Sequence, residues 1–304
     1  MDIDKDRAGQ RIDNFLFGLL KGVPKQHIYR IIRRGEVRVN SKRISPFYRL
    51  TAGDKIRIPP VRTAKPSVAL LPDHFDQAQL DSRIIYEDNS MLAINKPAGM
   101  PVHGGTGQQC GLIEAVRLLR SESRFLELVH RLDLETSGCL LIAKKRSALR
   151  VLHAHFRENR VFKSYQALLA GKLQKQKQFV DAPIRKERNA DGSRKIFVGE
   201  NGKQAMTEIR CIRHWDQYTH VECRPRSGRT HQIRVHAQFI GHPIIGDQRY
   251  GVANVNKIAS AYGLKRLFLH ATSLRFPHPE TSEIITLESA LETDLVEYLL
   301  TLGV

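Results

Sequence analysis

The spacing of apolar residues predicts two short helices and a small sheet at the start of the chain. Apolar side chains recur at three- and four-residue spacing over residues 12–19 and again over 28–32, which is typical of helices that bury one face. Gly35 is placed to end the second helix. Residues 36–40 and 54–58 alternate between apolar and polar side chains, as strands do.

After about residue 81 the pattern changes to many strands with a few helices between them. The expected strands cover residues 84–89, 91–94, 139–143, 163–169, 207–213, 219–224, 267–271 and 274–276. The expected helices cover residues 112–119, 148–159 (capped by Ser147), a part-buried stretch around 233–240, and 291–300.

These patterns predict an α+β protein with two folded parts. Residues 11–60 form a small module, and residues 81–304 form a large domain. Residues 61–80 are expected to be a linker, because they hold prolines and show no period. A chain of 304 residues with 41% hydrophobic residues is large enough for such a core, which argues against global disorder.

The charge favours a polyanionic partner. The net charge is +18, from 49 Lys and Arg against 31 Asp and Glu, which fits nucleic acid better than a membrane surface. The apolar runs are far shorter than the roughly 20 residues of a spanning helix. The first residues are charged and lack an apolar signal core, so we expect a cytoplasmic protein.

Metal and cofactor motifs are missing from the sequence. The four cysteines have no two-residue spacing, which argues against a zinc site or a disulfide framework. No His-Glu-x-x-His and no Gly-Lys-Ser/Thr occurs, and the glycines near residue 105 lack the dinucleotide spacing. We therefore expect no metal and no cofactor.

The small module carries a concentrated positive charge. Residues 21–62 hold twelve Lys and Arg but only two acids. A solvated face would explain such a run, but a basic face on a compact unit also neutralises phosphates without reading sequence. The candidate RNA-binding residues are Lys25, Arg30, Arg33, Arg34, Arg38, Lys42 and Arg43.

Residues 130–138, His-Arg-Leu-Asp-Leu-Glu-Thr-Ser-Gly, lead directly into the apolar run 139–143. A polar segment held by a buried strand is a suitable place for a catalytic side chain. Asp133 is ionised at pH 7 if its pKa stays near the usual value of about 3.9, and Arg131 is near enough in sequence to favour the charged form. An ordinary surface ion pair is the alternative explanation for an Arg-x-Asp sequence.

The segment 130–138 resembles the signature of the RluA-type pseudouridine synthases. The Asn-Lys-Pro-x-Gly that begins at residue 95, the Lys-x-Tyr at 163–165 and the Gly-Arg-Thr-His-Gln-Ile-Arg-x-His at 228–236 are similar to other motifs of that family. Residues 11–54 resemble the RNA-binding module first seen in small-subunit ribosomal protein four. The resemblance implies a catalytic domain of the pseudouridine synthase fold, with a mixed, mainly antiparallel sheet flanked by helices and loops, plus a small N-terminal α/β RNA-binding module.

The resemblance also implies roles for particular residues. Asp133 is the catalytic residue, Tyr165 is placed against the target base, and one Arg of the motif at 228–236 faces Asp133. We expect that Arg to be Arg229, with Arg234 as the second candidate. The remaining roles are those of Arg131, which fills the place of the flipped base or holds the strand, and Ile233, an apolar floor. His231 and His236 are expected to be structural.

The implied function is the isomerisation of uridine to pseudouridine in large-subunit (23S) ribosomal RNA or a pre-ribosomal particle, by a monomer without a cofactor, protein partner or membrane. The match is closest to the RluC subtype, and the RluD subtype also carries the N-terminal module. Asp133 could act as a nucleophile or as a base. The alternatives are a glycoside hydrolase, with Glu135 as the second carboxylate, and a non-catalytic ribosome-assembly factor.

Overall fold

The computed structural model describes residues 1–4, 7–20, 22–61, 71–72, 75–104, 110–188 and 194–303. The chain folds into two units, Met1–Ala69 and Leu70–Val304. Most of the expected linker, residues 62–70 and 73–74, lies outside the described residues, as do Gly105 and Gly107 of the glycine-rich loop. Among the helices that are described, none is both long and apolar enough to cross a bilayer.

The described part of the small unit has two helices and a three-stranded antiparallel sheet of order β2-β1-β3. Its elements are α1 (Ile12–Leu19), α2 (Lys25–Arg33), β1 (Arg38–Val39), β2 (Lys42–Arg43) and β3 (Ile56–Arg57). The strands are shorter than expected, because Asn40 and Ser41 both take positive φ and turn the chain at once. Gly35, with φ of +72°, follows the end of α2 as expected.

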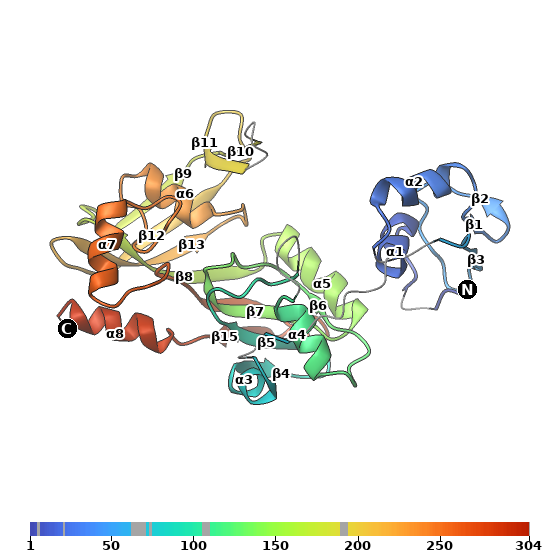
Figure 1. Ribbon diagram of the computed structural model, residues 1–304, viewed down its shortest axis with the longest axis horizontal. Coiled ribbons are helices and arrows are strands. Elements are labelled where there is room, and N and C mark those ends of the chain that lie inside the picture. Colours follow the sequence, from blue (N-terminus) through green and yellow to red (C-terminus); the bar gives the residue numbers. More distant parts are fainter. Residues whose placement is uncertain are drawn as a thin grey trace. The chain divides into compact units, whose positions relative to one another are not determined.

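The large unit is built on a mixed sheet of ten strands, which confirms the expected fold class (Figure 1). The strand order is β4-β5-β7-β14-β8-β13-β12-β9, with β15 on β14 and β6 on β7, and β7–β14 is the one parallel pair among them. The strands are β4 (Ile84–Glu87), β5 (Met91–Lys96), β6 (Glu127–Leu128), β7 (Ser137–Ala143), β8 (Phe162–Ala170), β9 (Lys177–Asp181), β12 (Met206–His214), β13 (Tyr218–Pro225), β14 (Leu269–Pro277) and β15 (Ile284–Glu288). A separate hairpin of β10 (Ile184–Arg188) and β11 (Arg194–Val198) stands out from the sheet at the top of Figure 1.

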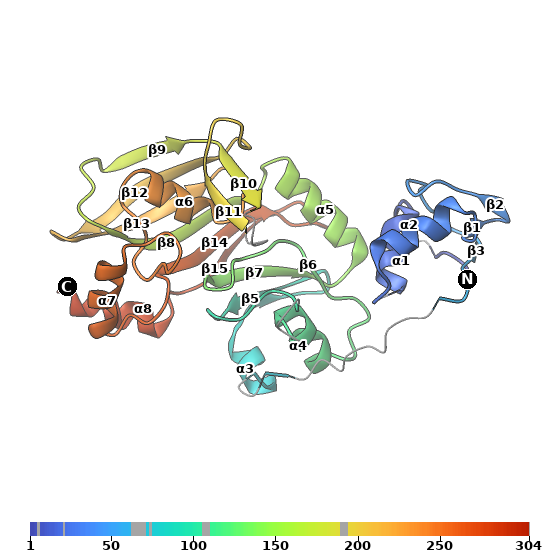
Figure 2. The same ribbon diagram turned by 45° about the horizontal axis from the view of Figure 1, so that its top comes forward.

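The six helices among the described residues of the large unit cover the sheet unevenly. They are α3 (Gln77–Ser82), α4 (Leu112–Leu119), α5 (Arg146–Arg157), α6 (Gln232–Phe239), α7 (Ala253–Ala261) and α8 (Thr293–Thr301). Side chains on one face of β7 pack in the hydrophobic core beside α4, and those on the other face pack in the core beside α5. β7 is therefore buried on both sides. Helices α6, α7 and α8 pack on one face of β8, β12 and β13 (Figure 2).

Two expectations about these elements were wrong. Two separate last strands were expected, at 267–271 and 274–276. Instead, β14 is one strand through both stretches, with a bulge between Ala271 and Ser273. Ser147 does not cap α5, because the helix starts earlier and its N-cap is Lys145, which makes no side-chain cap bond.

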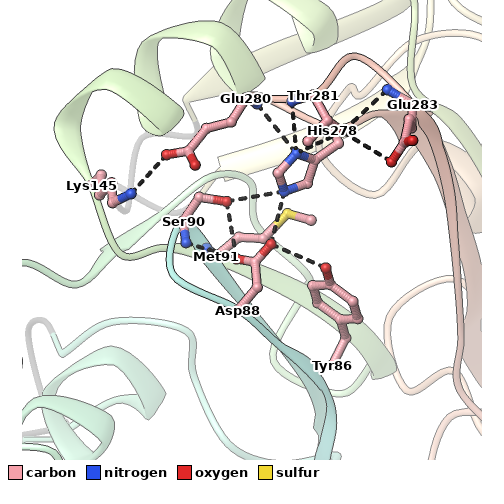
Figure 3. Close-up of polar contacts among 9 residues, drawn as sticks. All are labelled: Tyr86, Asp88, Ser90, Met91, Lys145, His278, Glu280, Thr281 and Glu283. Carbon is pink, nitrogen blue, oxygen red and sulfur yellow. Dashed lines mark hydrogen bonds and ion pairs between the residues drawn. The ribbon is translucent and has the colours of Figure 1, made fainter.

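A part-buried polar cluster joins the β4–β5 turn to the segment after β14 (Figure 3). The Asp88 carboxylate accepts hydrogen bonds from the backbone N–H groups of Ser90 and Met91, at 2.7 and 2.8 Å, and from His278 Nε2 at 2.8 Å. Burial would raise the pKa of Asp88, but these donors outweigh burial and hold the pKa below its usual range. The cluster therefore fixes two distant parts of the chain to each other.

Candidate active site

The loop that carries Asp133 is held by its own neighbours in the signature. The His130 ring stacks on Phe156 at 5.1 Å and accepts a 3.1 Å hydrogen bond from the backbone N–H of Leu141 in β7. Burial lowers the pKa of His130 to about 3, so the ring is neutral at pH 7. His130 therefore anchors the loop and has no acid–base role.

The last residues of the signature bring β7 against β14. Gly138 has φ of +110°, and a Cβ atom there would lie 2.3 Å from the carbonyl oxygen of Ala271. Ser137 Oγ makes a 2.8 Å hydrogen bond with His270 Nδ1 and accepts one from Arg266. The small residues are required because the two parallel strands approach closely at this point.

Asp133 faces a cleft of about 300 Å³, with its side chain a quarter exposed. The cleft is lined by the signature loop, by β8 and by the start of α6; its lining includes Arg131, Asp133, Lys163, Tyr165, Arg229, His231, Ile233 and Arg234. The structure thus brings all six candidate residues of the large domain together. Asp133 is the one carboxylate among the lining residues, and Glu135 is not one of them. This arrangement argues against the glycoside hydrolase, which needs two carboxylates across one cleft.

The arginine next to Asp133 is Arg234, so the expectation for Arg229 was wrong. Arg234 Nη1 lies 3.8 Å from Asp133 Oδ2, whereas Arg229 is exposed and its Nε donates to the carbonyl oxygen of Gln204 at 3.1 Å. The difference comes from where α6 begins. Arg234 is in the first turn of α6, where residues 232–237 are all buried, while Arg229 precedes the helix.

A second acid holds Arg234 in place. Asp247 accepts hydrogen bonds from Nε and Nη2 of Arg234 at 2.7 and 2.8 Å, and the backbone N–H groups of Arg249 and Tyr250 also donate to it. Burial would lower the pKa of Arg234, but the bonds and the charge of Asp247 raise it. Asp247 was not singled out from the sequence, because it lies beyond the motif at 228–236.

His231, which was expected to be structural, also lines the cleft. It is the N-cap of α6 and takes a left-handed conformation with φ of +54°. Its Nδ1 lies 2.8 Å from the Tyr250 hydroxyl, and its Nε2 lies 3.9 Å from Asp133 Oδ2. Burial lowers its pKa, so a neutral ring faces Asp133 at pH 7. His236 is structural as expected, because it is buried between Thr207 and Ala182.

The opposite wall of the cleft comes from β8. Tyr165 lies on this central strand, paired with Ala271 and Cys223, so its ring is fixed by the middle of the sheet. Burial, and then the charge of Asp133, raise the pKa of Tyr165, which keeps the phenol neutral. Ile233 is buried in the wall that α6 contributes. An aromatic ring beside an apolar surface suits a flat uncharged base.

Lys96 was missed in the sequence because its partners are backbone atoms distant in the chain. It is fully buried at the end of β5, and its Nζ donates to the carbonyl oxygens of Pro97, Met100 and Leu134 at 2.8, 2.8 and 3.0 Å. Burial lowers its pKa to about 7. Lys96 therefore ties the loop after β5 to the residue next to Asp133. The sequence signals for Lys96 are its place in the Asn-Lys-Pro-x-Gly motif and its position at the end of a buried strand, and neither reveals its backbone acceptors.

The basic residues of the small unit lie where an RNA-binding face would need them. Six of the seven candidates, Lys25, Arg30, Arg33, Arg34, Lys42 and Arg43, are exposed, and Arg38 is half-buried. Ile28, Ile31 and Ile32 on the other side of α2 are buried. In the described parts of the chain, no group of three or more His, Cys, Asp or Glu could hold a metal ion.

Comparison with known proteins places the chain in one family. The family model of RNA pseudouridylate synthase matches residues 90–239, and the S4 domain model matches residues 10–56. The ribosomal large subunit pseudouridine synthase C of Salmonella typhimurium is 51% identical over 96% of this chain and 93% of its own length, and that of Pasteurella multocida is 48% identical over 98% and 92%. The solved structure of human RNA pseudouridylate synthase domain containing 4 is 28% identical, with a TM-score of 0.61 over 74% of this chain and 94% of that one. With about half of its residues identical to those relatives over nearly its whole length, the chain belongs to the RNA pseudouridylate synthase family.

Proposed function

We propose that the protein isomerises uridines of large-subunit (23S) ribosomal RNA, with Asp133 as the catalytic residue. The observation that carries this proposal is the pairing of one cleft carboxylate, Asp133, with a buried arginine that a second acid holds in position. The substrate is suggested by the relatives, which are named as ribosomal large subunit pseudouridine synthases. We further propose that the protein acts in the cytoplasm as a monomer.

The domain boundaries fit this activity. Residues 11–60 would form the RNA-binding module, residues 61–80 the linker, and residues 81–304 the catalytic domain. The module would bind phosphates through Lys25, Arg30, Arg33, Arg34, Arg38, Lys42 and Arg43, without reading sequence. Base identity and chemistry would be left to the cleft.

The reaction breaks the C1′–N1 bond, turns the uracil and joins C5 to C1′, so there is no net oxidation or group transfer. The base must first leave its stack to reach Asp133. Arg131 is exposed at the cleft and is placed to occupy the vacated position or to hold the displaced strand. Tyr165 would stack on the base above the Ile233 surface. Arg234 would orient Asp133 and place a positive charge beside it while Asp133 attacks a carbon atom or removes a sugar proton.

The test is isomerisation of protein-free large-subunit ribosomal RNA by wild type, Asp133→Asn and Glu135→Gln, with the modified positions mapped by carbodiimide adducts and reverse transcription. Asp133→Asn keeps the size of the side chain but removes its charge, and should abolish the reaction while RNA binding persists. Glu135→Gln should remain active. Full activity of Asp133→Asn would refute the catalytic assignment, and release of free uracil would identify a hydrolase.

RNA binding by wild type without any modified position would exclude protein-free large-subunit ribosomal RNA as the substrate. The same assay on total cellular RNA and on pre-ribosomal particles would then separate another substrate from a non-catalytic binding role, since only a substrate yields new stops in reverse transcription.

A further inference from the structure

One face of the sheet in the large unit is left open. Helices α6, α7 and α8 cover one face of β8, β12 and β13, and alternate residues of these strands point to the other face. Cross-strand pairs on that other face include Arg224 with Glu208 and Arg275 with Phe162. A groove of about 580 Å³ lies there, floored by β8, β12, β13 and β14.

The groove is basic. Five cations line it, namely Lys163, Arg210, Arg224, Arg226 and Arg275, against the two acids Glu208 and Glu222. Glu208 is buried and pairs with Arg210 and, at 3.6 Å, with Arg226, while Arg224 pairs with Glu222 at 2.9 Å. Arg275 is exposed and has no ion-pair partner among the described residues. The two acids thus position several arginines and leave an excess of positive charge facing solvent.

The groove is continuous with the cleft of Asp133. Lys163 and Pro225 line both hollows. A third hollow, of about 610 Å³, contains Arg157 and shares Arg229 with the cleft and Arg226 with the groove. A basic surface therefore runs from the catalytic cleft, around residues 225–229, to the open face of the sheet.

We propose that this groove binds the single strand of RNA next to the target uridine, with its phosphates on Arg226 and Arg275. The inference rests on the proposed function and extends the RNA contact beyond the cleft and the small module. A positive groove that opens directly into a site for a flipped base has the charge and the position that a flanking strand needs.

Phe162 adds a surface for a base. It is the first residue of β8, its exposed fraction is 58%, and its cross-strand neighbour is Arg275. An exposed aromatic ring beside an arginine stacks on unpaired bases whatever their identity. The combination favours RNA over an acidic protein, which would use the charges but not the flat ring.

The test compares Arg226→Gln/Arg275→Gln and Phe162→Ala with the matched control Lys257→Gln/Lys265→Gln. Lys257 and Lys265 are also exposed but line none of the three hollows. Each enzyme is assayed on a long RNA and on a short RNA that ends close to the target uridine. Thermal unfolding midpoints within a degree of wild type establish that the variants are folded.

On the long RNA, we expect KM to rise about tenfold for the double arginine variant and for Phe162→Ala, and to stay unchanged for the lysine control. The slope of log Kd against log salt should fall by about 1.4 in the arginine variant, since each lost phosphate contact on a single strand removes about 0.7. On the short RNA, the variants and wild type should have the same KM.

Equal KM values and salt slopes for the arginine variant and the lysine control, with an active wild type, would overturn the inference and leave the proposed function standing. Wild type that converts no uridine in either RNA would refute the proposed function, and the inference would fall with it.

Discussion

Arg234 lies 3.8 Å from Asp133 through its Nη1 atom alone. The other two nitrogen atoms of the guanidinium donate to Asp247, which is buried. The planar group is therefore held at two points and presents its third nitrogen to the cleft. Such an arrangement fixes the position of a positive charge beside Asp133 before any substrate binds.

Arg234→Lys should lower kcat about 100-fold, because a lysine cannot bond both oxygens of Asp247 and still present a donor to Asp133. The release of tritium from RNA labelled at C5 of uridine measures this rate under single-turnover conditions. Arg229→Lys should lower kcat much less, since Arg229 contacts Gln204 instead of Asp133. A larger loss in Arg229→Lys than in Arg234→Lys would show that the pairing is wrong.

Lys96 should make stability depend on pH. Its pKa is lowered to about 7 in the folded chain and returns to about 10.4 on unfolding. Between these values the unfolded chain binds more protons, so the free energy of unfolding should rise from pH 7 to pH 10. Urea unfolding across this range should show a difference in the free energy of unfolding between wild type and Lys96→Met that changes with pH. The difference between wild type and Lys257→Met, the exposed control, should stay constant.

The cluster around Asp88 should contribute about 1–3 kcal/mol to the free energy of unfolding. Asp88→Asn replaces one of the two acceptor oxygens with an NH₂ group, which faces the same donors and cannot accept from them (Figure 3). The variant should therefore lose this free energy of unfolding at pH 7. Because the pKa of Asp88 is lowered by folding, the difference from wild type should be complete above about pH 5 and shrink as pH falls below about 4.

The exposed pair Lys145–Glu280 provides the control for that measurement (Figure 3). Both side chains are more than two-fifths exposed, so Glu280→Gln should change the free energy of unfolding by less than about 1 kcal/mol. Equal effects of Asp88→Asn and Glu280→Gln in urea unfolding at pH 7 would contradict the role assigned to the cluster.

Lys25→Gln/Arg33→Gln in the small unit should weaken RNA binding without altering the rate at saturating RNA. Both side chains are exposed on α2, and the chemistry belongs to the large unit. The affinity should fall equally for RNAs of different sequence, and the salt slope should decrease by about 0.7 to 0.9 for each lost phosphate contact. Filter binding at several salt concentrations measures both quantities, and a lower kcat would contradict the separation of roles.

The sequence was sufficient where one local pattern determined the outcome. The apolar period placed the helix Leu112–Leu119 correctly, and the signature and motifs brought Asp133, Tyr165 and Ile233 to one cleft. The choice between Arg229 and Arg234 depended on where α6 begins. The motif at 228–236 contains both residues, with Arg229 before the start of the helix and Arg234 inside it.

Other features depended on contacts between distant segments. Lys96 is satisfied by three carbonyl groups, one of them 38 residues away, and no side-chain pattern encodes such acceptors. His231 lies in the cleft, where it takes a left-handed backbone conformation at the N-cap of α6 that the sequence did not reveal. The bulge after Ala271 kept β14 continuous through polar residues that had suggested two strands.

The place of β14 in the sheet sets an order of events during protein synthesis. Asp133 precedes β7 and Tyr165 lies on β8, yet these strands are not neighbours, because β14 (Leu269–Pro277) lies between them. A growing chain of which only residues up to 268 have left the ribosome contains both residues. It cannot bring them together in one cleft, because β14 is not yet present. Contacts so far apart in sequence form late. The enzyme can therefore become active only after β14 has been synthesised, so a product truncated before Leu269 would hold both Asp133 and Tyr165 without the activity.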